Sequence, residues 1–181
     1  ATFERVFGRK PVGLWPSEGG VSQQALALFA EFDFRWVASG GNVLNNSHDS
    51  ASKSCSHRVY RFGDVALDCF FRDDGLSDLI GFSYSDWHAD DAVANLVGHM
   101  ENIARACPDR DDCLITIILD GENAWEYYPE NGYHFLSQLY RSLAKNPLLQ
   151  MTTFEQFQRE KTPRPAREEH LVAGSWVYGT F

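Results

Sequence analysis

Residues 113–119, with the sequence CLITIIL, are apolar at every position except Thr116, and the run ends at Asp120. An unbroken apolar run of this kind is typical of a strand in a parallel sheet that is covered on both faces. Parallel neighbours must be joined by crossover connections, which are usually helices. We therefore predict an α/β chain in which residues 114–119 form an interior strand of a parallel sheet, with Asp120 at its carboxyl end.

The rest of the chain alternates apolar runs with helix-like periodicity, as an α/β fold requires. The predicted strands lie at 10–16 and 35–41, and residues 59–62 and 65–73 could form a hairpin or a strand with its lead-in. The predicted helices lie at 21–32, 86–107, 133–146 and 152–160. The first helix is expected to bury one face, made of Val21, Ala25, Leu28, Phe29 and Phe32. The tail, residues 162–181, shows no regular pattern.

Length and charge narrow the class of protein further. The chain has 181 residues, of which 44% are hydrophobic, and this fits a single domain over residues 1–181 with a core of its own. The formal net charge of −9 argues against nucleic acid and anionic membrane surfaces as partners. No apolar run approaches the roughly 18 to 20 residues of a membrane span. We therefore expect no nucleic-acid and no membrane partner.

The cysteines and histidines show no metal-binding spacing. Cys55, Cys69, Cys107 and Cys113 form no CxxC pair, and the six histidines are scattered, so we expect no metal and no cofactor. Cys107 and Cys113 bracket a short polar stretch and could be bridged. Reduced thiols in a cytoplasmic protein are the favoured interpretation.

Acidic and glycine residues follow several of the predicted strands. In parallel α/β sheets the active site lies beyond the carboxyl ends of the strands. Glu18, residues 40–41, residues 72–73 and Asp120 all fall at such ends, so we expect them to line one rim. Two carboxyl groups on one rim can act as nucleophile and general acid in glycoside hydrolysis, where an oxocarbenium-like centre develops as the leaving oxygen is protonated.

Each acid also has a purely structural interpretation. Glu18 precedes a helix and could simply stabilise its N-terminus, and Asp120 could cap the turn after its strand. Glu122 and Glu126 lie close to Asp120 in sequence, and spacing alone does not choose among these acids.

Four stretches of the chain resemble glycoside hydrolase family 57. GLWPSEGGVS (residues 13–22) and LDGENAWEYYPENGYHFLSQLY (119–140) are similar to two regions of that family, in particular of its amylopullulanase-like and uncharacterised bacterial branches. FRDDGLSDLIGFSY (71–84) resembles the stretch between them, and GSWVYGTF (174–181) resembles the start of a later region. The resemblance covers essentially the whole chain in the correct order.

The resemblance implies a fold, a substrate class and residue roles. It implies a parallel-stranded portion of an incomplete (β/α)7 barrel that acts on starch-like α-glucans with retention of configuration, by hydrolysis or transglycosylation. Glu18 takes the role of nucleophile and Asp120 that of acid/base. The His-Gln-Pro motif of the family's first barrel strand does not occur here. The chain therefore resembles a central part of the catalytic barrel, without its N-terminal strands and C-terminal helical region, and its exposed sheet edges could self-associate.

Three alternatives to that function follow from the same residues. The protein could be a non-catalytic carbohydrate-binding or regulatory relative, and the truncated barrel could be inactive. A metal-dependent deacetylase-like barrel would need a His/Asp cluster, which the sequence does not show.

Further residues are candidates for binding the α-glucan. Each has a structural alternative. The tryptophans could stack on sugars or fill the core, and the Arg-Asp pair could bind hydroxyls or form a salt bridge. Glu122 could shift the pKa of Asp120 as a nearby like charge or face water, and the histidine could reach the site or lie on the surface. The candidates are Trp15, Arg72, Asp73, Glu122, Trp125, His170 and Trp176.

Residues 42–57 are rich in serine and asparagine and carry no large apolar anchor between Leu44 and Val59. Such a segment has little buried area to offset its ordering entropy. We predict a long, mobile loop after a strand end, and as a hypothesis it closes over the sugar cleft.

Overall fold

The computed structural model describes residues 2–48, 55–121 and 125–180. Its sheet has the order β1-β2-β4-β3-β5. The strands are β1 (Gly13–Leu14), β2 (Trp36–Ser39), β3 (Tyr60–Phe62), β4 (Asp68–Phe71) and β5 (Ala166–Glu168). β1, β2 and β4 run parallel, β3 is antiparallel to β4, and β5 is parallel to β3. The predicted α/β chain with a mainly parallel sheet is confirmed.

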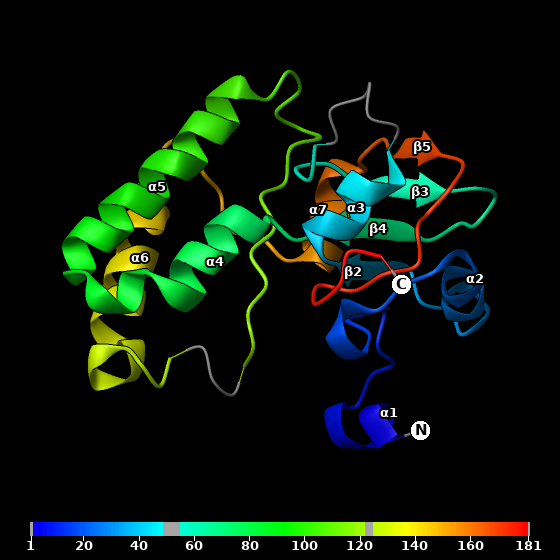
Figure 1. The fold of residues 1–181 in the computed structure, drawn as a ribbon, viewed down its shortest axis with the longest axis horizontal. Helices are drawn as coiled ribbons and strands as arrows, with labels where there is room; N and C mark the ends of the chain where they lie inside the picture. The colour runs from blue at the N-terminus through cyan, green and yellow to red at the C-terminus, as the bar shows by residue number, and fades with distance from the viewer. Residues whose placement is uncertain (1, 49–54, 122–124, 181) are drawn as a thin grey trace.

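The helices occupy two regions of the molecule. Their bounds are α1 (Thr2–Phe7), η1 (Ser17–Gly19), α2 (Gln23–Glu31), α3 (Gly41–Ser47), α4 (Asp74–Phe82), η2 (Tyr84–Asp86), α5 (Ala89–Ala106), η3 (Pro129–Gly132), α6 (Tyr133–Lys145) and α7 (Phe154–Lys161). Figure 1 shows α4, α5 and α6 together on one side, and the sheet with α2, α3 and α7 on the other. No helix in the described part of the chain is long and apolar enough to cross a membrane.

The side chains of β2 and β4 point alternately to the two faces of the sheet and pack in a separate apolar layer on each face. Val37 and Phe71 lie in the cluster that includes Leu26 of α2 and Leu44 of α3. Phe70, which precedes Phe71 in β4, lies in a separate cluster on the opposite face, with residues of α7. Successive strand side chains point to opposite faces, so each face needs its own cover. A third cluster joins α4, α5 and α6.

The prediction of a regular strand at residues 114–119 is wrong. The segment is extended chain without strand pairing, and its backbone bonds are sparse: Leu114 N–H donates to His57 O at 2.8 Å, and Thr116 O accepts from Asp73 N–H at 2.8 Å. The ladder of β4 ends at Phe71, so the segment runs beside the residues that follow β4. In Figure 1 it passes between the sheet and the helical group.

The packing of this segment nevertheless explains its apolar sequence. Leu114 and Ile118 pack in the cluster beside Phe70, whereas Ile115 and Ile117 pack against the α4–α6 cluster. Both faces therefore contact apolar neighbours, as the run predicted, although only Thr116 is fully buried and regular hydrogen bonding along the segment is missing. Side-chain patterning reports burial, and it does not report whether a neighbouring strand is present to pair.

The buried face of α2 differs from the prediction. Leu26 is 0% exposed, whereas Leu28 is 52% exposed and Phe32 is also exposed. We expect Leu26→Ala to lower the free energy of unfolding by about 2–5 kcal/mol, because it opens a cavity in the core beneath the sheet. The matched variant Leu28→Ala should lose less than about 1 kcal/mol. Urea unfolding of both variants measures the difference, and similar losses would contradict the observed orientation of the helix.

Three further expectations need correction. Residues 41–47 of the predicted long loop form α3, because Val43 and Leu44 supply a fully buried apolar face. Residues 49–54 of that loop lie outside the described residues, and its closure over a cleft stays a prediction. The tail contains β5, whose backbone pairs with β3. Cys107 and Cys113 form a disulfide across the turn after α5 instead of remaining reduced.

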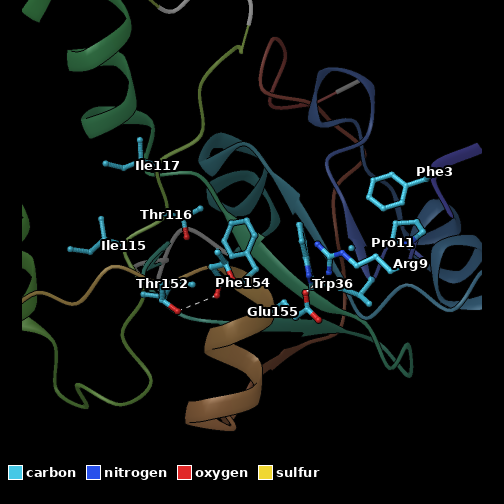
Figure 2. Close-up of a pocket in the computed structure, with 14 residues that line it drawn as sticks. Phe3, Arg9, Pro11, Trp36, Ile115, Thr116, Ile117, Thr152, Phe154 and Glu155 are labelled. Atoms are coloured by element: carbon cyan, nitrogen blue, oxygen red, sulfur yellow. Dashed lines mark hydrogen bonds and ion pairs between the residues drawn. The ribbon is translucent and has the colours of Figure 1, made fainter. Parts of the chain in front are cut away.

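A cleft of about 510 Å³ lies between β1 and the extended segment (Figure 2). Figure 2 shows Pro11 on one side and Ile115 and Thr116 on the other, and Gly13 and Trp36 also line the cleft. β1 is an edge strand of the sheet. The candidate acids Glu18 and Asp120 do not line this cleft. Self-association through exposed sheet edges stays a prediction.

Candidate active site

Glu18 sits in a strained backbone conformation in η1, the short helical turn that follows β1. It has φ 54° and ψ 21°, and Gly19 follows with φ 62°. A non-glycine residue in the left-handed region costs about 1–2 kcal/mol, and such conformations cluster at functional sites. Ser39, the last residue of β2, holds the turn, because its hydroxyl donates to Gly19 O at 2.7 Å. The carboxylate of Glu18 is exposed.

The C-terminal segment holds both the backbone and the side chain of Glu18. Trp176 N–H donates to Glu18 O at 3.0 Å, and Trp176 Nε1 donates to Glu18 Oε2 at 2.7 Å. The indole ring meets Trp15 edge to face, with centroids 4.9 Å apart. Gly40 allows this approach, because a Cβ there would lie 2.9 Å from Trp176 Cα. Trp176 therefore fixes where the carboxylate points.

Arg72 connects Trp176 to the chain that leads to Asp120. It is only 8% exposed, and its Cζ lies 5.5 Å from the centroid of the Trp176 ring. Its Nε donates to Ile118 O at 2.9 Å, two residues before Asp120. Its two terminal nitrogens donate to Asp74 at 3.0 Å and to Asp78 at 2.6 Å. A buried guanidinium needs such partners to offset its desolvation, so its geometry is well determined.

A cleft of about 840 Å³ is lined by Arg72, Trp176 and Asp120, whereas Glu18 does not line it and is connected to it through Trp176. It opens where α4, the end of the extended segment and the C-terminal segment meet. The charged and aromatic residues that line it are Arg72, Asp74, Asp78, Phe82, Asp86, Asp120, Glu126, Tyr127 and Trp176. Phe82 is 80% exposed and Tyr127 is 75% exposed. The cleft therefore combines carboxylates with open aromatic faces.

The remaining predicted binding residues that the structure describes do not line this cleft. Trp15 contacts Trp176, the residue that donates to the Glu18 carboxylate. The Asp73 side chain is bonded to His57 and caps α4, and it does not line the cleft. Trp125 packs in the α4–α6 cluster beside Phe135. His170 is exposed and lies outside the lining of the cleft, and Glu122 is outside the described residues.

Several lining residues were not anticipated from the sequence. Asp74 and Asp78 are one helical turn apart on α4 and lie two and six positions after Arg72, and that spacing was a usable signal for acids facing one cation. Asp74 also accepts from the backbone N–H of Asn42 at 2.9 Å, which ties α4 to the start of α3. Tyr127 carried no such signal, because its exposure depends on how the segment after Asp120 folds. Among the described residues, no cluster of three or more Asp, Glu, His or Cys side chains could hold a metal ion.

Sequence comparison identifies the family. Residues 1–168 match the model of glycosyl hydrolase family 57, and the chain therefore belongs to this family. No curated protein matches the chain significantly.

Solved structures show the same fold. The 4-alpha-glucanotransferase from Thermococcus litoralis is 19% identical with a TM-score of 0.76, and the match covers 97% of this chain and 26% of that protein. A family 57 branching enzyme from Thermococcus kodakaraensis is 15% identical with a TM-score of 0.77, covering 97% and 44%. The alpha-amylase AmyC from Thermotoga maritima is 11% identical with a TM-score of 0.78, covering 96% and 45%.

These likenesses establish the architecture. The chain is a mainly parallel portion of the incomplete (β/α)7 barrel that the resemblance implied. It spans between 26% and 45% of the length of these three proteins.

Proposed function

We propose that this chain carries both catalytic carboxylates of a retaining α-glucan hydrolase or transglycosylase, with Glu18 as nucleophile and Asp120 as acid/base. Membership of glycosyl hydrolase family 57 supports the reaction class. The glucanotransferase, branching enzyme and alpha-amylase that share the fold support an α-glucan as substrate. The observation that carries the assignment is the connection through Arg72, which contacts the Trp176 ring and the backbone two residues before Asp120.

The hydrogen bonds of Glu18 suit a nucleophile. Trp176 occupies one oxygen of its carboxylate, Oε2, and thereby orients the group. The carboxylate attacks the anomeric carbon while Asp120 gives its proton to the glycosidic oxygen, and the C–O bond to the leaving sugar breaks. Asp120 then takes a proton from water, or from a sugar hydroxyl in transglycosylation, and the new oxygen displaces Glu18. Configuration is inverted twice and therefore retained.

The cleft beside Asp120 suits a neutral polyhydroxylated ligand. Asp78 and Asp86 can accept hydrogen bonds from sugar hydroxyls, and the excess of carboxylates disfavours anionic ligands. Phe82 and Tyr127 present open aromatic faces on which the apolar face of a pyranose ring can stack. Arg72, Trp15 and Trp176 complete the proposed binding residues. A bound sugar would gain both stacking area and directed hydrogen bonds.

The full-length protein that contains this chain is expected to convert amylose or maltooligosaccharides, with a product of retained α configuration. Proton NMR of the newly formed anomeric centre measures that configuration before mutarotation. A β-linked glucan of equal length is the control and should remain intact. Inverted product would overturn the roles of Glu18 and Asp120. Binding of maltooligosaccharides without turnover would instead support the non-catalytic alternative.

A further inference from the structure

Cys55, His57 and Asp73 form a chain of three interacting groups outside the candidate active site. His57 Nε2 lies 2.7 Å from Asp73 Oδ2, and His57 Nδ1 lies 3.9 Å from Cys55 Sγ. The side chains of His57 and Asp73 are 18% and 14% exposed, whereas Cys55 is exposed. A thiol, an imidazole and a carboxylate in this order form the arrangement that activates cysteine nucleophiles. None of the three lines the cleft that holds Asp120.

Neighbouring elements hold each group in place. Asp73 caps α4, since its Oδ1 accepts from Leu76 N–H at 2.9 Å. The backbone carbonyl of His57 accepts a hydrogen bond from Leu114 N–H of the extended segment at 2.8 Å. Tyr60, at the start of β3, donates its hydroxyl to Cys55 O at 2.9 Å and accepts from Cys55 N–H at 3.3 Å. The contact of the thiol with the imidazole is therefore set by backbone anchors at both ends.

The electrostatics favour an imidazolium beside a thiolate. Burial alone would lower the pKa of His57, but its hydrogen bonds to Asp73 and Cys55 outweigh burial and raise this pKa to about 9. The hydrogen bond from His57 lowers the pKa of the Cys55 thiol, although burial opposes it. Burial would raise the pKa of Asp73, but the bonds from His57 and Leu76 lower it. An imidazolium at this position donates to the Asp73 carboxylate and stabilises the thiolate form of Cys55 when that form is present.

The other ionisable groups near the thiol do not reverse this balance. The positive charge of Arg58 acts on Cys55 in the same direction as His57. Tyr60 stays neutral beside it, because burial raises the pKa of its phenol. Glu168, on β5, acts on Tyr60, and Arg72 acts on Asp73. The remaining cysteines differ in kind: Cys69 is a buried thiol, and Cys107 and Cys113 are bonded to each other.

We propose that Cys55 is a reactive thiol that accepts a small thiol from a low-molecular-weight disulfide such as oxidised glutathione. The Cys55 sulfur attacks one sulfur of the disulfide, the new S–S bond forms as the old one breaks, and the released thiolate leaves with the bonding electron pair. His57, held by Asp73, stabilises the attacking thiolate and can supply a proton to the departing one. No electrons are needed beyond those in the disulfide.

The rate of alkylation by iodoacetamide, a neutral probe, tests the activation of Cys55 in the intact protein. At pH 6 a lowered thiol pKa raises the fraction of Cys55 present as thiolate. A thiolate of lower pKa is also a weaker nucleophile, so each tenfold rise in that fraction is offset by about a threefold loss in the rate constant of the thiolate. We expect native Cys55 to react at least about threefold faster than the same cysteine in urea-unfolded chain at this pH. Peptide mass spectrometry assigns the label, and Cys69 should stay unlabelled until the protein unfolds.

The variant His57→Gln separates activation from mere exposure. The amide nitrogen of glutamine can reach the position of Nε2 and donate to Asp73, so the local fold is retained, but the amide cannot carry the positive charge. Its alkylation rate at pH 6 should fall to that of unfolded chain, and its pH profile should move to higher pH. Oxidised glutathione should add one glutathione to the native protein and none to Cys55→Ser. Equal rates for native and unfolded Cys55, an unchanged rate in His57→Gln, or addition elsewhere than Cys55 would each overturn the proposal.

Discussion

Glu18→Gln in the full-length protein is expected to lower kcat on α-glucans by at least about 10³-fold, equivalent to roughly 4 kcal/mol of transition-state stabilisation. The amide is nearly the same size and can still accept from Trp176 Nε1 through its oxygen, so the backbone turn and the indole contact should be retained. It cannot form the glycosyl ester, because it is not a carboxylate. Release of reducing ends from amylose measures the loss.

Two matched variants assign this loss to chemistry and not to folding. Glu18→Asp keeps the carboxylate but withdraws it by about one bond length, and a misplacement of about 1 Å can cost about 10²-fold. Glu18→Gly suits the φ of 54° at this position and opens space beside the anomeric carbon. Added azide should then restore turnover and give a glycosyl azide of inverted configuration. Near-normal activity of Glu18→Gln on α-glucans would remove Glu18 from the mechanism.

Strand ends in the sequence pointed to Arg72 and Asp120, and both line the same cleft, whereas Glu18 lies outside its lining. The catalytic roles of Glu18 and Asp120 stay predictions. Trp176 was found only through the resemblance of its motif. Its contact with Glu18 spans 158 positions of the chain, and no local periodicity reports such a distance.

The incorrect expectations share a physical cause. Apolar periodicity reports that a side chain is buried, but it is silent on the partner of the backbone. Residues 114–119 contact apolar clusters on both faces and yet make few backbone hydrogen bonds. α3 begins within a polar stretch because Asp74, brought close by the fold, accepts from the backbone of Gly41 and Asn42 at its N-terminus. A helix capped by a distant residue leaves no signature in its own sequence.

Arg72 and Asp73 have different partners, and their sequence positions alone did not distinguish them. They are adjacent, and the sequence predicted a common role for them. The structure turns Arg72 toward Asp74, Asp78 and Trp176, whereas the carboxylate of Asp73 accepts from His57. Adjacent residues at the end of a strand point to opposite sides, so one faces the cleft and the other faces the loop that carries Cys55.

Asp120→Asn is expected to slow turnover of natural α-glucans by about 10²- to 10⁴-fold, because the glycosidic oxygen then leaves without a proton. An activated aryl α-glucoside has a leaving group that needs little protonation, so its glycosylation step should be nearly unaffected. The second step still needs a base to take the proton of water. The glycosyl ester on Glu18 should therefore accumulate, and a burst of the released phenol measures it.

Azide separates the two acids by stereochemistry. It is an anionic nucleophile that needs no base, so it should accelerate the second step in Asp120→Asn and give a glycosyl azide of retained configuration, opposite to that from Glu18→Gly. The roles require the two carboxyl groups to lie about 5 to 5.5 Å apart in the complete barrel, against about 6.5 to 9.5 Å for an inverting pair. Equal losses on aryl and natural substrates, with no burst, would mean that another acid of the cleft, such as Glu126, protonates the leaving oxygen.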